Sequence, residues 1–316
     1  MKKKLLVAFM MGLFITGCGK ETATYDTVEV VEEAEVNEAS SSANDEGTAK
    51  SEAESQSETD ASDSENAEET AWEDYSEEIT TKVQLIAAAS TTVQEEISQV
   101  EELVAQYEEL VNGDISQAAM NQAAQWPAYV WDAELNCLWQ RMSDELDDDS
   151  KATVLENLRQ WNAMKEDAIV CAIGYEEDGG SIYGLSYQQQ VELMTMKKVY
   201  YLANEYAAYR GEVFEMPECP IYGVYVNDEG GTGDIYDSLA IIENYAGENE
   251  AEITLYGITT LNGSVSENGD NLSFESEDGD VSGTITYGWD GATFTVDSCE
   301  SGMVNAGDTF TFSIVF

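Results

Sequence analysis

Residues 261–297 read LNGSVSENGDNLSFESEDGDVSGTITYGWDGATFTVD. Apolar and polar side chains alternate through this stretch, which predicts strands with one buried face. Asn-Gly and Asp-Gly pairs interrupt the alternation, and such pairs adopt the positive φ that two-residue hairpin turns require. The stretch therefore predicts consecutive antiparallel hairpins. The predicted turns are Asn262-Gly263, Asn268-Gly269, Asp278-Gly279, Asp290-Gly291 and, further along the chain, Gly307-Asp308.

The same pattern covers residues 216–316. About eight short strands at a spacing of roughly ten residues are typical of a meander that closes as a small barrel or sandwich. We expect the aromatic side chains on these strands to pack in its core rather than to line a binding face. The predicted strands are 221–226, 240–245, 252–256, 261–266, 271–275, 282–287, 293–297 and 309–315.

Residues 79–215 have the period of helices instead. Apolar residues three and four apart run from Val83 to Val111, which predicts an amphipathic helix that ends at Asn112-Gly113. This stripe fits either the seam of a coiled-coil dimer or, as we favour, packing within a bundle of the same chain. Further helices are expected before and after Pro127, which should kink or divide them, and up to about Arg210. The predicted fold class is α+β and multidomain, with an antiparallel helical bundle followed by an all-β antiparallel meander.

The first residues predict export. Three lysines follow Met1, and the apolar run 5–15 is too short to span a bilayer but suits a signal peptide. The run ends in Ile15-Thr16-Gly17-Cys18, which resembles the bacterial lipobox. The resemblance implies a signal peptide over 1–17 and acyl chains on Cys18, which would anchor the protein on the extracytoplasmic face of the cell membrane. The alternative is an ordinary secretory signal with an incidental cysteine.

An acidic tail follows the predicted lipidation site. Residues 21–78 contain 21 acidic side chains and one basic side chain, Lys50, with almost no large apolar residues. Such a composition cannot bury enough surface to offset the entropy of ordering, so we expect a disordered linker over 18–78. It would serve as a spacer, or alternatively as an interaction tail for a basic partner.

Charge and composition exclude several functions. The chain has 64 acidic and 13 basic residues and a net charge of −51, which argues against nucleic-acid binding. It has no histidine, which removes Ser-His-Asp and Cys-His nucleophile systems and every metal site that needs histidine. We expect no catalytic residue, no cofactor and no resident metal. The acidic loops 228–234 and 275–280 offer oxygen ligands for Ca²⁺, but neither has an EF-hand register, and turn chemistry accounts for them.

Five ordered motifs lie in the helical part. They are Ser116-Gln-Ala-Ala-Met120-Asn121; Asp132-Ala-Glu134-Leu135-Asn136 with Trp139 and Met142; Trp161 with Lys165-Glu166; Gly179-Gly180-Ser181; and Thr195 with Lys198, Tyr200 and Leu202. Together they resemble the LprI-type lysozyme-inhibitor domain over about residues 114–205. The resemblance implies a partner such as lysozyme or another basic protein that acts on the cell wall. Cysteines that the family often has are absent here, so its disulfide pattern is not implied.

We expect mainly structural roles for these motif residues. Trp161 is predicted in the bundle core, and Lys165 and Lys198 are predicted to pair with carboxylates such as Asp132 or Glu166. Asp132, Glu134 and Asn136 are predicted to alternate around their helix, so that the three do not share one face. The loop 175–181 is the predicted insert that would enter the cleft of lysozyme.

Four cysteines remain besides Cys18 in a compartment that permits disulfides. The simplest of the three connectivities joins Cys137 to Cys171 and Cys219 to Cys299. Each bond would contribute about 3–4 kcal/mol by restricting the unfolded chain.

Three functions follow from these features. The first is a lipid-anchored binding module that inhibits lysozyme or another basic protein. The second is a structural or scaffolding protein of the cell envelope that does not inhibit lysozyme. The third, a wall hydrolase that uses two carboxylates, is least favoured, because acids are so abundant that two near each other mean little.

Overall fold

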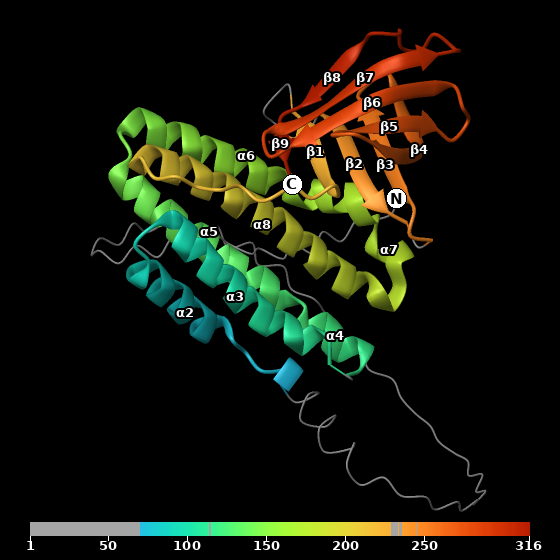
Figure 1. Cartoon of the computed structure of the whole chain (residues 1–316). Helices are drawn as coiled ribbons and strands as arrows, with labels where there is room; N and C mark the ends of the chain where they lie inside the picture. Colours follow the sequence, from blue (N-terminus) through green and yellow to red (C-terminus); the bar gives the residue numbers. More distant parts are fainter. Residues whose placement is uncertain (1–69, 114, 229–232, 234–235, 245) are drawn as a thin grey trace, which may run out of the picture. The chain divides into compact units, whose positions relative to one another are not determined.

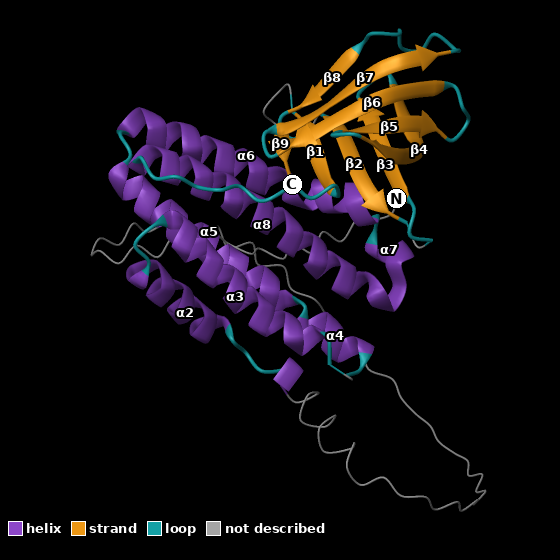
Figure 2. Ribbon diagram, viewed as in Figure 1, coloured by secondary structure: helices purple, strands orange, loops and turns teal. Residues whose placement is uncertain are grey.

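The computed structural model describes residues 70–316, except residues 114, 229–232, 234–235 and 245. Helices come first along the chain and an antiparallel sheet follows (Figures 1 and 2), as the sequence predicts. The predicted signal peptide, Cys18 and most of the predicted acidic linker lie outside the described residues. Within the described part of the chain, no helix has the length and apolar character needed to cross a bilayer.

The helices pack around a central pair, α5 and α8. Helices α2 and α3 pack against α5, and α3, α4 and α6 pack against α8. The helices are α2 (Ser76–Ala89), α3 (Val93–Val111), α4 (Gln117–Ala123), α5 (Gln125–Glu145), α6 (Asp148–Ile173), α7 (Glu176–Gly179) and α8 (Tyr183–Arg210).

The apolar stripe predicted as one helix is divided into α2 and α3. Ser90 has extended backbone angles, and the Thr92 side chain accepts a hydrogen bond from the Glu95 backbone N–H. The Glu95 carboxylate in turn accepts one from the Thr91 backbone N–H at 2.8 Å. This reciprocal capping begins a new helix although the apolar spacing continues across the break. The apolar face of α3 packs inside the bundle, which is the arrangement we favoured over a dimer seam.

Two other helix boundaries follow the sequence. The helices divide at Ala124, and Pro127 occupies the first turn of α5, where its missing N–H leaves no intrahelical hydrogen bond unmade. Gly211 has a φ of 72° and ends α8 at Arg210, because glycine adopts this left-handed conformation without steric cost.

The nine strands in the described part of the chain form one antiparallel sheet that nearly closes as a barrel. Their order is β8-β7-β6-β5-β4-β3-β2-β1-β9. Only Ser313 separates β8 from β9, so one short segment pairs with β7 through its first half and with β1 through its second half. The strands are β1 (Gly223–Asn227), β2 (Asp237–Glu243), β3 (Asn249–Leu255), β4 (Thr259–Asn268), β5 (Asn271–Ser276), β6 (Val281–Gly288), β7 (Gly291–Cys299), β8 (Thr309–Phe312) and β9 (Ile314–Val315).

Some glycines of the sheet are required by the φ of a turn, and others are required by close packing between strands. Gly269 and Gly279 have positive φ at the β4–β5 and β5–β6 turns, as predicted. The predicted turn at Asn262-Gly263 is wrong, because Gly263 lies inside β4. A Cβ there would collide with the Phe274 ring and the Glu275 backbone on β5, so glycine is required for close approach rather than for a turn. The chain turns instead at Gly257, whose φ is 71°.

Strand β1 is buried on both faces and joins two apolar cores. Tyr225 belongs to the core inside the sheet, together with Phe274 and Phe294. Val224 and Val226 belong to a second core that extends into the helices. Successive strand residues point to opposite faces, so β1 contributes to both cores at once.

Candidate functional site

Three helices bring several motif residues together. Lys165 on α6 donates a hydrogen bond from Nζ to Thr195 Oγ1 on α8 at 3.2 Å. Its Nζ lies 5.1 Å from the centroid of the Trp161 ring, and Lys198 Nζ lies 5.8 Å from the same ring. Two ammonium groups therefore flank one indole, an arrangement that the electron-rich ring face favours. We call Asp132, Trp161, Lys165, Thr195 and Lys198 the motif cluster.

Trp161 also connects α6 to the sheet. Its Nε1 donates a hydrogen bond to the Val315 carbonyl at 3.1 Å. Its ring stacks on Phe316 with centroids 5.9 Å apart and planes inclined by 13°. The side chain is 3% exposed, as expected for a core residue, and the core it occupies is shared with β1 and β9.

The lysines of the motif cluster are largely desolvated. Burial lowers the pKa of Lys165, and the negative charge of Asp132 opposes that shift. Burial lowers the pKa of Lys198 to about 8. The predicted carboxylate partner of Lys198 is absent among the described residues, and the rings of Trp161 and Tyr201 lie next to its Nζ instead. An apolar aromatic surrounding therefore replaces the expected ion pair.

The Asp132-Ala-Glu134-Leu135-Asn136 motif divides between two faces of α5. Asn136 Nδ2 donates to the Asp132 carbonyl at 2.8 Å and to its Oδ2 at 3.1 Å. The prediction that Asp132, Glu134 and Asn136 do not all share one face is confirmed, although Asp132 and Asn136, four residues apart, are neighbours on the helix. Glu134 does lie elsewhere, close to Glu96 on α3.

The remaining motifs build the connection between α6 and α8. Asn121 Nδ2 donates a hydrogen bond to the Ser181 carbonyl at 2.9 Å, and Gln117 Nε2 donates to Asn121 Oδ1 at 2.8 Å. Gly180 has a φ of 59°, a conformation that other residues rarely adopt. Asn121 on α4 thus holds the turn that contains the Gly179-Gly180-Ser181 motif, although Asn121 and Ser181 are 60 residues apart in the chain.

This connection presents exposed side chains. The region predicted as loop 176–181 contains the short helix α7 and a 3₁₀ turn over Gly180–Ile182. Tyr175 is 66% exposed, and Ile182, Glu176 and Glu177 are also exposed. An aromatic ring and an aliphatic side chain beside two carboxylates suit a contact with a cationic, partly apolar surface.

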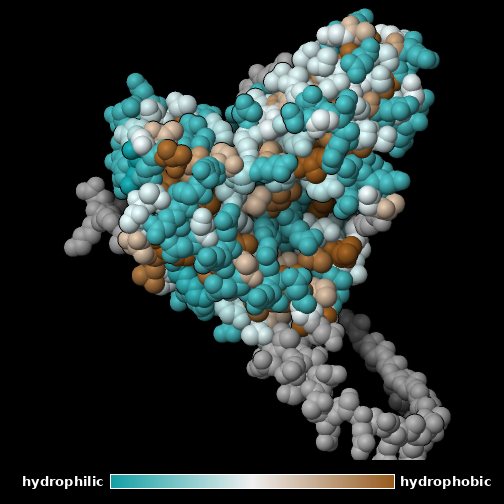
Figure 3. All heavy atoms as spheres, in the orientation of Figure 1, coloured by the Kyte–Doolittle hydropathy of each residue, from teal (hydrophilic) through white to brown (hydrophobic). Residues whose placement is uncertain are grey.

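Acidic and aromatic groups continue onto α6 and α8. Tyr187 donates a hydrogen bond from its hydroxyl to Glu166 Oε1 at 2.8 Å, and its ring lies 6.2 Å from that of Tyr183. Burial raises the pKa of Tyr183, and the charges of Glu176 and Glu166 raise it further. We call Glu166, Tyr175, Glu176, Glu177, Tyr183 and Tyr187 the tyrosine–acid surface. The face drawn in Figure 3 is mostly hydrophilic, with small separate hydrophobic patches.

Replacing Asn121 by alanine is expected to loosen the turn. The variant loses the hydrogen bond to the Ser181 carbonyl, which contributes about 0.5–1.5 kcal/mol to stability. Amide hydrogen exchange should become faster over residues 175–183 and stay unchanged in the sheet. Asn268→Ala is the matched control, because it removes a side-chain bond to Ser273 at 3.1 Å in the β4–β5 hairpin. Equal exchange over 175–183 in the Asn121 variant and the wild type would contradict this role.

The structure contains neither predicted disulfide. Cys137, Cys171, Cys219 and Cys299 are all free. Cys171 Sγ lies 4.0 Å from Ser238 Oγ on β2, and Cys299 Sγ lies 3.5 Å from Asp280 Oδ2. These two thiols therefore have polar neighbours rather than a second sulfur.

The acidic loop 275–280 uses its carboxylates within the turn. Asp278 accepts hydrogen bonds from the Ser276 hydroxyl and the Asp280 backbone, and Asp280 accepts from Ser301. These contacts agree with turn chemistry. Most of the other acidic loop, 228–234, lies outside the described residues.

Sequence reasoning missed three buried charged residues. Glu96 forms an ion pair with Arg141, and both of these side chains are mostly buried. Lys197 is almost completely buried on α8 and donates from Nζ to the Tyr222 carbonyl at 2.8 Å. One feature of the sequence indicates that Lys197 is buried. It lies three residues from both Met194 and Tyr200, which are on a buried helix face.

A comparison with protein-family models supports the resemblance. Residues 111–202 match the family model described as lysozyme inhibitor LprI. This LprI segment contains α4 to α7 and most of α8, and therefore both the motif cluster and the tyrosine–acid surface. It covers less than a third of the chain and ends before the first strand. No curated protein and no solved structure matches the chain.

Proposed function

We propose that this protein is an extracytoplasmic binding module that inhibits lysozyme or another basic protein acting on the cell wall. The observation that carries the proposal is the LprI match over residues 111–202. Within that segment, Asn121 and the glycine turn hold an exposed aromatic and acidic connection in place. We propose that the tyrosine–acid surface is the contact with the basic partner.

The charge of the chain supports this choice of partner. A net charge of −51 produces a negative field that attracts cationic proteins and raises their association rate. The exposed tyrosine can then pack against aliphatic or cationic side chains once the partner is bound. Charge therefore brings the partner to the surface, and the aromatic contact retains it.

The proposal includes the location. The lipobox resemblance at Ile15-Thr16-Gly17-Cys18 supports lipidation of Cys18. The acidic linker after it would hold the folded residues away from the membrane. A binding module for secreted lytic enzymes needs such a position outside the cell.

The test is lysis of cell-wall substrate by lysozyme in the presence of the chain from Gly19 onward. We expect inhibition at low salt that weakens by about tenfold or more at high salt, because screening removes the long-range attraction. The triple variant Tyr175→Ala, Glu176→Gln, Glu177→Gln should inhibit at least tenfold less. Tyr256→Ala is the matched control, because Tyr256 is 56% exposed on the β3–β4 turn and should be neutral.

Two outcomes would reject this function. Lysis that proceeds unchanged at low salt excludes lysozyme as the target, and equal inhibition by the triple variant excludes the tyrosine–acid surface.

The alternative function is that of an envelope scaffold. The burial of the motif cluster favours it, because those residues then preserve the bundle rather than contact a partner. Recovery of another envelope component with the anchored chain, without any effect on lysozyme, would support it.

A further inference from the structure

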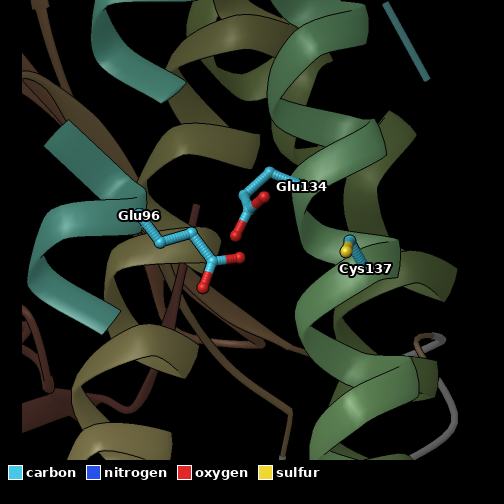
Figure 4. Close-up of side chains that lie close together, drawn as sticks. All are labelled: Glu96, Glu134 and Cys137. Carbon is cyan, nitrogen blue, oxygen red and sulfur yellow. The ribbon is translucent and has the colours of Figure 1, made fainter. Parts of the chain in front are cut away.

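Helices α3 and α5 bring three potential metal ligands together. One ligand atom each from Glu96, Glu134 and Cys137 lies within 4.8 Å of the others. Glu134 and Cys137 are one turn apart on α5, and Figure 4 shows the two carboxyl groups pointing toward one another across the gap between α3 and α5. Glu134 and Glu96 are buried, unlike the many acidic side chains on the surface.

Glu134 is incompletely satisfied. The side chain is completely buried, and neither of its carboxyl oxygens has a hydrogen-bond partner among the described residues. The guanidinium of Arg141 forms an ion pair with Glu96 and lies 4.0 Å from Glu134 Oε1. One guanidinium thus lies near two buried carboxyl groups. Burying a carboxyl group without hydrogen-bond partners costs free energy.

The protonation states follow from this arrangement. Burial and the neighbouring charge of Glu96 raise the pKa of Glu134 well above its ordinary value. Burial raises the pKa of the Cys137 thiol to about 11. Both shifts favour the protonated forms of Glu134 and Cys137 in the metal-free protein, and Arg141 pairs with Glu96.

We propose that Glu96, Glu134 and Cys137 form a binding site for one divalent cation of the zinc class. A thiolate combined with two carboxylates suits Zn²⁺, whereas Mg²⁺ and Ca²⁺ take oxygen ligands alone. Three protein ligands leave the fourth position of a tetrahedral zinc ion for a water molecule or another ligand. The set contains no histidine, so the absence of histidine from the chain does not exclude it.

Binding of Zn²⁺ at this site requires that protons leave the ligands and that Arg141 moves. The incoming Zn²⁺ displaces one proton from the Glu134 carboxyl and one from the Cys137 thiol, and both protons pass to solvent. Arg141 must release Glu96, and its side chain, 28% exposed, has access to solvent for that movement. Affinity should therefore increase with pH, and removing the competing guanidinium should strengthen binding.

The test uses the metal-free chain from Gly19 onward, titrated with ZnCl₂ and separately with MgCl₂. We expect one Zn²⁺ per chain, proton release measured calorimetrically in buffers of different ionisation enthalpy, and no comparable binding of Mg²⁺. Cys137→Ser and Glu134→Gln should each bind Zn²⁺ at least tenfold more weakly, and Arg141→Ala should bind it more tightly. The matched controls are Cys171→Ser and Glu192→Gln, partly buried residues on α6 and α8.

Cobalt provides an independent readout. Co²⁺ bound at this site should show thiolate-to-metal charge-transfer absorption that disappears in Cys137→Ser and persists in Cys171→Ser. Zinc uptake that is equal in all variants would overturn the proposal, because the surface acids would then account for it. If circular dichroism shows that Glu134→Gln does not fold, Cys137→Ser decides, since it removes no buried carboxyl group. The outcome is independent of lysozyme inhibition, because the site uses no residue of the tyrosine–acid surface.

Discussion

Trp161→Ala is expected to lower the free energy of unfolding by about 3–5 kcal/mol, the range for truncation of a buried tryptophan. The side chain is 3% exposed, so its removal leaves a cavity between α6 and the end of the sheet. The Val315 carbonyl loses its donor, and Phe316 loses its stacking partner. Lys165 and Lys198 also lose the ring that lies beside their ammonium groups.

Urea denaturation followed by circular dichroism measures this effect. Trp72→Ala is the matched control, because Trp72 is 56% exposed and should change stability by no more than about 0.5 kcal/mol. Trp161→Phe should cost about 1–2 kcal/mol, because it retains an aromatic ring against Phe316 but leaves the Val315 carbonyl without its donor. A loss below about 1 kcal/mol for Trp161→Ala would show that Trp161 does not hold α6 to the sheet.

Local chemistry made much of the fold predictable. The turns at Gly269 and Gly279 follow from dipeptides that readily adopt the positive φ of a hairpin turn. Gly263 follows the same sequence rule but lies inside β4, because the reason for glycine there is the Phe274 ring on the neighbouring strand. The break between α2 and α3 was missed for a related reason, since the apolar spacing continues across it while Thr92 and Glu95 cap a new helix.

The sequence predicted which residues belong to the site, but not which residues they contact. The motifs identified Trp161 and Lys198, and periodicity placed them on helices, but neither shows which segments lie beside a helix face. Trp161 contacts Val315, 154 residues away in the chain. Lys198 has ring neighbours where the abundance of acids suggested a carboxylate. Likewise, the ion pair of Glu96 with Arg141 joins α3 to α5 and follows from tertiary packing alone.

Lys197→Met is expected to change how stability depends on pH. Lys197 is 1% exposed, donates from Nζ to the Tyr222 carbonyl at 2.8 Å, and lies 5.1 Å from the Tyr225 ring centroid. Burial lowers its pKa from 10.5 to about 8, and the charge of the Cys219 thiolate opposes the shift only partly. Between these two values the unfolded chain holds the proton and the folded chain does not. The stability that Lys197 contributes therefore rises with pH across that window, by about 3 kcal/mol in total.

The methionine variant lacks this rise. At pH 7 it should be about 1–2 kcal/mol more stable than the wild type, because the relief of burying a charge exceeds the loss of one hydrogen bond. By pH 10 the wild type should have overtaken it. Lys151→Met is the matched control, because Lys151 on α6 also donates from Nζ to a backbone carbonyl, that of Ser143 at 3.0 Å, but is only partly buried. Urea unfolding at pH 7, 8, 9 and 10 measures all three proteins. Parallel pH profiles for Lys197→Met and the wild type would show that Lys197 keeps its charge in the folded protein up to its ordinary pKa.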